Sequence, residues 1–269
     1  MLVGKNSLKL MMIFIKRKIR YLFFGAIVPI LCAINKYLPI YACKYLKYED
    51  SFKGEKCIVV GTAPSLTKAD LYKYKKRGYK IIGVNSIIKF LTPSEIAELI
   101  DIYVIQDVQV FERLESDIRT LTKYSIPVFI GSPIFYKYFA TAHELGVSFA
   151  LNLLGHYKEV FKMPYNTKFS SGRKGYIYDG YTVVYSAVQL AVFFGFKEIG
   201  VLGVDAVYNK NIDKRNVVDI GKVDPTWETA CDRINYAFSI AYDACEYELV
   251  TLYNLNKSGN LNTIPRYYA

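Results

Sequence analysis

The segment Gly61–Leu66 joins a glycine, two hydroxyl side chains and the approach to a helix in an order that suits anion binding. Four apolar residues end at Gly61, and Thr67 with Asp70 three residues later has the pattern of a helix capping box. A loop between a strand end and a helix start directs backbone N–H groups and a partial positive charge toward one point, which suits a phosphate or a carboxylate. An ordinary strand-to-helix turn has the same pattern. The loop also matches neither common nucleotide motif, G-x-x-x-x-G-K-[ST] or G-x-G-x-x-G.

A second candidate anion-binding point lies where a long apolar helix is expected to begin. Thr182 or Asp179 would cap this helix, which is apolar on nearly every face and is therefore expected to be buried. Gly180 would let a ligand approach the helix start closely, and Gly195 is expected to end the helix in a left-handed conformation. A strand follows at once and places Asp205 at its end.

Polar residues follow five of the predicted strands at the point where each strand ends. In open α/β sheets, ligands bind beyond the carboxyl ends of the strands, so this pattern predicts a ligand site along that edge. Single members also have simpler roles, because Asn85 and Asp107 would cap helices and Asp205 would hold a turn. The candidate residues at this edge are Gly61, Thr62, Asn85, Gln106, Asp107, Ser132 and Asp205.

The elements that must position these residues alternate between strand-like and helix-like stretches from residue 56 onward. This alternation predicts an α/β domain over residues 51–269, with a Rossmann-like, mainly parallel sheet and helices on both faces. The stretch 135–178 is less periodic and is interpreted as a lid insertion over the sheet edge. Strands are expected at 56–60, 80–84, 102–105, 127–130, 199–204 and 248–253, and helices after Ser65, Pro93, Gln109 and Asp179 and over about 227–246.

The first 50 residues form a separate basic and apolar segment. They hold nine Lys and Arg residues against two acidic ones, and so account for +7 of the net charge of +11. Two apolar runs, 8–15 and 21–34, flank a basic cluster, and the longer run falls short of the about 20 residues that span a bilayer. A helical segment lying on an anionic membrane surface is favoured, with a tilted span or a core helix as alternatives.

The rest of the composition argues against several classes of protein. Outside residues 1–50 the chain is only mildly basic, which argues against a nucleic-acid partner. The five cysteines include no C-x-x-C pair and have no histidine at metal-ligand spacing, which predicts buried thiols in a reducing cytoplasm rather than a zinc site. A hydrophobic content of 52% excludes a disordered chain.

Several segments together resemble one superfamily of bacterial enzymes. They are GTAPSL at 61–66, Asn85 after the second strand, DGYTVVYSAVQLAVFFGFKEIGVLGVD at 179–205 and LYNLNKSGNLNTIPR at 252–266. The superfamily contains sialyltransferases of the family 42 type, motility-associated glycosyltransferases that modify flagellin, and a domain found in a pterin pyrophosphokinase. The resemblance covers about residues 56–205 and 240–267 and implies a GT-A-like fold.

The resemblance also implies roles for particular residues. Contacts to the nucleotide ribose and phosphate would come from Gly61, Thr62, Ala63, Pro64, Ser65 and Asn85. Contacts to the sugar or its carboxylate would come from Asp179, Gly180, Tyr181 and Thr182, with Tyr208 near the leaving phosphate. The sialyltransferases carry a catalytic histidine after the aspartate-ended strand, but this chain has no histidine beyond His156. Asp205, His156 and His143 are therefore the candidate general bases.

These roles imply a glycosyltransferase of the sialyltransferase type. It would move a nonulosonic, sialic-acid-like sugar from a CMP-linked donor to a cell-surface glycan or a lipid-linked acceptor, as in polysaccharide or lipopolysaccharide biosynthesis. The resemblance implies no essential metal, and hence no cofactor. A lipid-linked acceptor and the basic segment 1–50 together predict peripheral attachment to the cytoplasmic face of the inner membrane.

Two other functions remain open at this point. A pyrophosphokinase or another metal-dependent nucleotide enzyme would need paired carboxylates to hold Mg²⁺, and Asp107 with Asp205 is the plausible pair. A non-catalytic relative would need neither. Binding of CMP against binding of ATP with magnesium separates the first two functions, and absence of nucleotide binding favours the third.

Overall fold

The computed structural model describes residues 46–145, 148–153, 165, 167–173, 176–207, 216–218 and 227–267. The chain divides into two compact units, residues 1–43 and 44–269, and the described residues all belong to the second. The predicted membrane-associating segment lies almost entirely outside the described residues. Within the described residues, no helix combines the length and the hydropathy needed to cross a bilayer.

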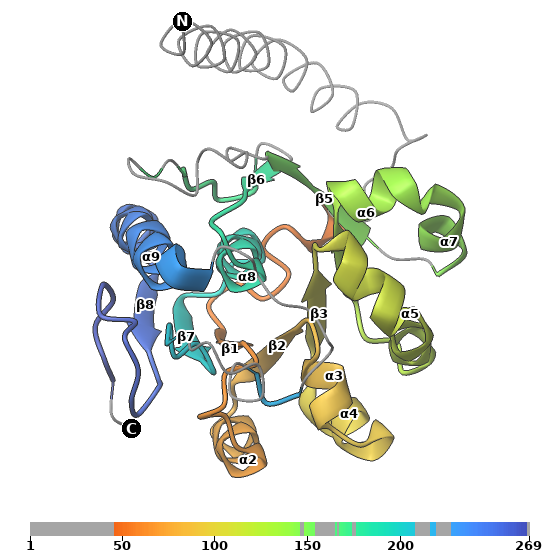
Figure 1. Ribbon diagram of the computed structural model, residues 1–269, viewed down its shortest axis with the longest axis horizontal. Coiled ribbons are helices and arrows are strands. Elements are labelled where there is room, and N and C mark those ends of the chain that lie inside the picture. The colour runs from red at the N-terminus through yellow and green to blue at the C-terminus, as the bar shows by residue number, and fades with distance from the viewer. Residues whose placement is uncertain are drawn as a thin grey trace, which may run out of the picture. The chain divides into compact units, whose positions relative to one another are not determined.

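The described part of the second unit is built on one sheet. Its strands are β1 (Lys56–Val60), β2 (Lys80–Val84), β3 (Ile102–Ile105), β4 (Val128–Gly131), β5 (Ser148–Leu153), β6 (Tyr176–Tyr178), β7 (Glu198–Leu202) and β8 (Thr251–Asn254). Their order is β6-β5-β4-β3-β2-β1-β7-β8, and each neighbouring pair is parallel (Figure 1). The central strands are short, mainly apolar runs that are buried except for the half-buried lysines at the start of β1 and β2, as expected where helices cover both faces.

Helices cover both faces of this sheet. They are η2 (Leu46–Tyr48), α2 (Lys68–Lys76), α3 (Ile87–Phe90), α4 (Pro93–Leu99), α5 (Val108–Lys123), α6 (Ser132–Lys137), α7 (Phe139–Glu144), α8 (Val183–Phe193), η5 (Trp227–Thr229) and α9 (Ala230–Tyr247). Figure 1 shows α2, α4 and α5 on one face and α8 and α9 on the other. The chain runs from β1 outward to β4 in one direction and from β7 to β8 in the other. Right-handed connections therefore place the two sets of helices on opposite faces.

The predicted Rossmann-like α/β fold is confirmed, with one correction. All six predicted strands and the five predicted helices are present, but the stretch 135–178 is not only a lid. Its described part includes α7, and β5 and β6 extend the sheet beyond β4. Strand β6 has three residues, and runs this short carry no periodicity that distinguishes a strand from a loop.

The signals at helix ends are confirmed as well. The side chain of Thr67 accepts a hydrogen bond from Asp70 N at 3.2 Å, which caps α2. The side chain of Thr182 caps α8, and Gly195 follows that helix with φ +89°. These caps fix where α2 and α8 begin, at the carboxyl edge of the sheet.

Helix α8 is buried along its whole length, and the side-chain amide of Gln189 links it to β6 at the edge of the sheet. Gln189 is 0% exposed. Its Oε1 accepts from Ser170 N at 3.0 Å and from Tyr178 N at 2.9 Å, while its Nε2 donates to Tyr178 O at 2.7 Å. Gln189 thus links this mostly apolar helix to the backbone of β6.

Replacing Gln189 by leucine is expected to destabilise the protein by about 2–4 kcal/mol, because several buried backbone groups lose their partners together. Chemical denaturation measures this difference. Gln109→Leu, the same change at an exposed position of α5, should alter stability by less than about 0.5 kcal/mol. Equal stabilities for the two variants would contradict the anchoring role of Gln189.

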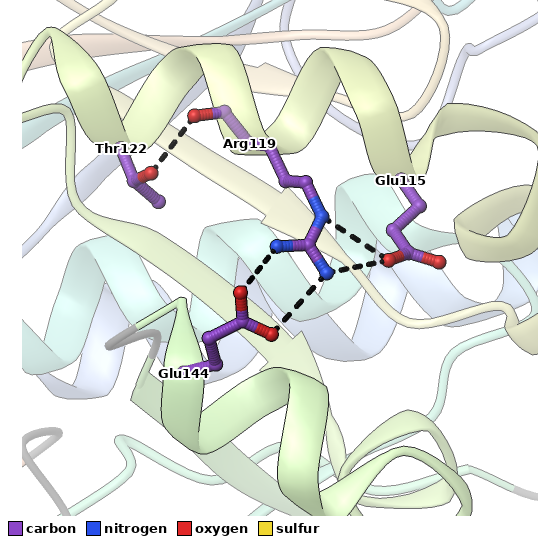
Figure 2. Close-up of polar contacts among 4 residues, drawn as sticks. All are labelled: Glu115, Arg119, Thr122 and Glu144. Atoms are coloured by element: carbon purple, nitrogen blue, oxygen red, sulfur yellow. Dashed lines mark hydrogen bonds and ion pairs between the residues drawn. The ribbon is translucent and has the colours of Figure 1, made fainter.

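An arginine fork joins α5 to α7 at the periphery (Figure 2). Arg119 Nη1 lies 2.8 Å from Glu144 Oε1, and its Nη2 lies 2.9 Å from Glu115 Oε1 one turn earlier in α5. Hydrogen bonds from Arg119 lower the pKa of Glu144. The fork helps to position α7, which lies far from the carboxyl edge near β1 and β7.

Candidate functional site

A cavity lies at the topological switch point of the sheet. The chain leaves β1 toward α2 on one face, whereas it leaves β7 toward α9 on the other (Figure 1). A cavity of about 150 Å³ lies beside the ends of these strands and is also lined by the end of β2 and the start of α8. The predicted residues that line it are Gly61, Thr62, Ala63, Pro64, Asn85, Thr182 and Asp205. A larger hollow of about 390 Å³ beside residues 261–266 is lined by none of the predicted site residues.

The loop after β1 uses most of its N–H groups inside the protein. Two of them donate to carbonyl oxygens at the end of β7, at 2.8 and 2.9 Å. The groups that donate within the protein are those of Gly61, Ala63, Ser65 and Leu66. The expectation that this loop offers its N–H groups to an anion is therefore wrong for these four. The loop instead forms one wall of the cavity.

The space beside two glycines of the predicted site is filled by protein atoms rather than left open for a ligand. A Cβ atom at Gly61 would lie 2.4 Å from Gly203 O, so the missing side chain lets the loops after β1 and β7 touch. A Cβ atom at Gly180 would lie 2.1 Å from the ring of Tyr185. Both glycines act through packing, which places the elements around the cavity.

Asn85 lines the cavity and has a buried amide oxygen without a partner among the described residues. Its backbone is left-handed, with φ 47°, and is fixed because Asn85 N donates to Val104 O and Asn85 O accepts from Tyr103 Oη at 2.6 Å. Asn85 Oδ1 is buried and has no hydrogen-bond partner among the described residues. Such a group costs about 1–3 kcal/mol, and an O–H or N–H group of a ligand would remove this cost.

The N-terminus of α8 forms the opposite wall. Thr182, Val183 and Val184 all line the cavity. The side chain of Thr182 accepts from Val184 N at 3.4 Å. Tyr185 N also donates to Thr182 O, at 3.1 Å. The N-terminus of a helix carries a partial positive charge, so this wall still suits an anionic group.

Gln106 and Asp179 support the start of α8 rather than line the cavity. Asp179 Oδ1 accepts from Tyr181 N at 3.0 Å and from Gln106 Nε2 at 3.4 Å. Gln106 Oε1 accepts in turn from Ser186 Oγ within α8. Tyr181 has φ 69°, a strained value for an aromatic residue, of the kind that clusters at functional sites.

Asp205 joins the two loops that meet at the switch point. Ser65 Oγ donates to Asp205 Oδ1, and Ser65 N donates to Asp205 Oδ2 at 3.2 Å. Asp205 is also one of the residues that line the cavity. Its carboxylate therefore holds the loop after β1 at the edge of the cavity.

The other predicted residues lie elsewhere. Asp107 is the N-cap of α5, where its Oδ1 accepts from two first-turn N–H groups at 2.9 and 3.1 Å. Ser132 is buried at the start of α6. His143 belongs to α7. His156 and Tyr208 lie outside the described residues.

Sequence reasoning missed three polar residues around the site. Ser186 is buried in α8, Asn216 lines the cavity and accepts from Thr62 Oγ1 at 2.9 Å, and Asn256 is buried beside the loop after β7. Ser186 is a polar residue in a mostly apolar helix, and Asn256 belongs to the terminal LYNLN motif. From these two features of the sequence, a role for Ser186 and Asn256 at the site could have been predicted.

The carboxylate pair considered for a magnesium site is not brought together. Asp107 follows β3 and Asp205 follows β7, with β2 and β1 between them, so strand spacing alone separates them by about 14 Å. In the part of the chain that the structure describes, no group of three or more His, Cys, Asp or Glu residues is arranged to hold a metal ion.

Comparisons with known proteins place this fold and its loops in a family. No curated protein matches the chain. Among solved structures, the sialyltransferase CstII from Campylobacter jejuni, in complex with the substrate analogue cytidine-5′-monophosphate, is similar with a TM-score of 0.44 and 13% identity. The similarity covers 81% of this chain and 89% of that chain. The family described as 6-hydroxymethylpterin diphosphokinase MptE-like matches residues 34–211, which include β1 to β7 and most of the cavity lining. The chain belongs to the MptE-like family.

Proposed function

We propose that the cavity binds an activated nucleotide and that the protein is a glycosyltransferase. The donor is a CMP-linked nonulosonic acid, and the acceptor is a cell-surface glycan or a lipid-linked sugar. The loop motifs at 61–66 and 179–205, which resemble those of bacterial sialyltransferases, support this choice of donor.

One juxtaposition supports the proposal most. The N-terminus of α8 suits a phosphate, and the buried Asn85 Oδ1 on the neighbouring wall needs an O–H or N–H donor. A nucleotide carries both groups, a phosphate and the hydroxyls of its ribose. Both walls line the same cavity at the switch point, where α/β sheets bind nucleotides.

The reaction needs a base for the acceptor hydroxyl and donors for the departing phosphate. In this proposal the departing phosphate lies against α8, since a carboxylate would repel it at the other wall. Asp205 then faces the acceptor hydroxyl, and Ser65 fixes the orientation of its carboxylate. His156 remains the alternative base.

A transfer assay tests this function. The full chain is incubated with a CMP-linked nonulosonic acid and a membrane glycolipid extract in the presence of EDTA. Release of CMP together with a labelled lipid product supports the proposal. Absence of both, from a protein that binds CMP, would contradict it.

The family match favours a second candidate, a diphosphokinase-like reaction on a hydroxymethyl compound such as a pterin. That reaction would transfer a diphosphate group from ATP and release AMP with Mg²⁺ present. AMP formation from ATP and 6-hydroxymethylpterin identifies this function. Release of CMP from the CMP-linked donor in the presence of EDTA identifies the glycosyltransferase.

Membrane attachment is a separate proposal that rests on residues 1–50. Deleting residues 1–45 is expected to move the protein from the membrane fraction to the soluble fraction with its nucleotide binding intact. Each basic residue near an anionic surface contributes about 1 kcal/mol, so high salt should weaken the attachment of the full chain. A truncated protein that still sediments, or a full-length chain that never does, would exclude this role.

A further inference from the structure

The segment after β8 holds the loop after β7 through one side chain. Asn256 is 2% exposed. Its Oδ1 accepts from Gly203 N at 2.7 Å and from Val204 N at 3.2 Å, and its Nδ2 donates to Val204 O at 3.1 Å. A single carboxamide therefore satisfies three backbone groups of the turn that ends β7.

The carboxamide of Asn256 is fully used. Its Nδ2 also donates to Asn254 Oδ1 at 2.6 Å, and Asn254 Nδ2 donates to Leu261 O at 2.7 Å. Since Oδ1 faces two N–H groups and Nδ2 faces two oxygens, only one orientation of the amide satisfies all four contacts. Both asparagines belong to the LYNLN motif, and Asn254 is 0% exposed.

The turn 203–205, which Asn256 holds, forms part of the cavity wall. Gly203 O accepts from Ala63 N at 2.9 Å, and Asp205 accepts from Ser65. The same C-terminal segment contacts this turn a second time, because Asn260 N donates to Asp205 O at 2.6 Å. Displacing the turn would therefore displace the loop after β1.

We infer that Asn256 is a positioning residue of the nucleotide site. It does not line the cavity, and it acts through the turn 203–205 to order the loop 61–66. The inference takes its functional meaning from the proposed nucleotide binding. The ordering of the loop is measurable without any nucleotide.

The substitution Asn256→Asp should make the ordering of the loop 61–66 depend on pH. One carboxylate oxygen would still accept from the two N–H groups, but the other would face Val204 O and Asn254 Oδ1, both acceptors. The protonated acid donates there, whereas the ionised form is repelled. The pKa of this aspartate in the folded protein would therefore lie above the about 3.9 of an unfolded chain. The loop should be ordered at low pH and lose order as the pH rises through that raised pKa.

Hydrogen exchange of full-length Asn256→Asp tests the inference, with Asn260→Asp as the matched control. Asn260 lies in the same segment with an exposed side chain, so it receives the same charge without the buried contacts. At about pH 8, the amides of residues 61–66 should exchange at least about 10-fold faster in Asn256→Asp than in the control. After correction for intrinsic exchange rates, the difference between the two variants should be smaller at about pH 5. The amides of β3 should exchange at the same rate in both variants.

Gly259→Ala perturbs the second contact between this segment and the turn, at Asp205 O. Its Cβ would lie 2.5 Å from that oxygen, so the variant should also speed exchange at residues 61–66. Unchanged exchange in Asn256→Asp would overturn the inference, whatever the result for Gly259→Ala. A CMP titration of the same proteins separates the two proposals. Faster exchange with weaker CMP binding supports both, whereas parent protein that fails to bind CMP contradicts the nucleotide site and leaves the ordering role intact.

Discussion

Replacing Gly61 by valine is expected to abolish nucleotide binding while the protein remains folded. The new side chain would begin 2.4 Å from Gly203 O and 2.9 Å from Val204 Cγ2, so the loops after β1 and β7 must separate. A displacement of about 1 Å can lower a catalytic rate on the order of 100-fold, and we expect the displaced wall to lower nucleotide affinity at least as much. Isothermal titration with CMP measures it, and circular dichroism checks the fold.

Gly78→Ala is the control for a general loss of stability. Gly78 has φ +79° and open space around it, at the end of the sheet opposite the cavity. This variant should be about 1 kcal/mol less stable than the parent but bind the nucleotide equally well. Unchanged affinity in Gly61→Val would show that the loop after β1 does not form the site.

Replacing Asp205 by asparagine is expected to lower turnover by at least about 100-fold, the usual scale for loss of general acid–base assistance. The amide keeps the shape of the side chain and loses the charge that the proposal assigns to the base. It also loses one of the two acceptor oxygens that Ser65 uses, so a modest change in nucleotide affinity is expected. Steady-state assays of donor turnover, with separate binding measurements, distinguish the two effects.

Two further variants assign the roles. Ser65→Ala leaves the Asp205 carboxylate in place but removes the hydroxyl that orients it, and a loss of turnover smaller than that of Asp205→Asn is expected. His156→Ala tests the alternative base. A large loss in His156→Ala with normal rates in Asp205→Asn would assign the base to His156. Near-normal rates in both variants would show that neither residue is the base.

Much of the fold was predictable because its signals are local. Strands β1, β2 and β3 are apolar runs that end at a glycine, an asparagine or a glutamine-aspartate pair, and their predicted bounds match the structure. The caps at Thr67 and Gly195 depend on neighbouring residues only. Strand β6 escaped prediction because it is short and depends on its pairing with β5 and on Gln189 of α8.

The site was predictable in place but not in detail. Polar strand ends predicted the carboxyl edge, and the cavity lies there. The loop after β1 was expected to offer its N–H groups to a ligand. Three of the four N–H groups instead donate to residues at or just after the end of β7, and one of these pairs, Ser65 and Asp205, lies 140 positions apart in the sequence. Such long-range contacts leave no local pattern, and so the roles of Gly61 and Asn256 required the structure.

The central claim is that the cavity at the switch point binds a nucleotide, and a thermal-shift panel of the full chain with CMP, UDP, GDP and ATP tests it most directly. At 100 times its Kd, a ligand specific for the folded state adds about 2.7 kcal/mol, which raises the Tm by roughly 5–10 °C for a domain of this size. We predict such a rise with CMP, in EDTA as well as with Mg²⁺, and its loss in Gly61→Val. No rise with any of the four nucleotides, or an equal rise in Gly61→Val, would contradict the account.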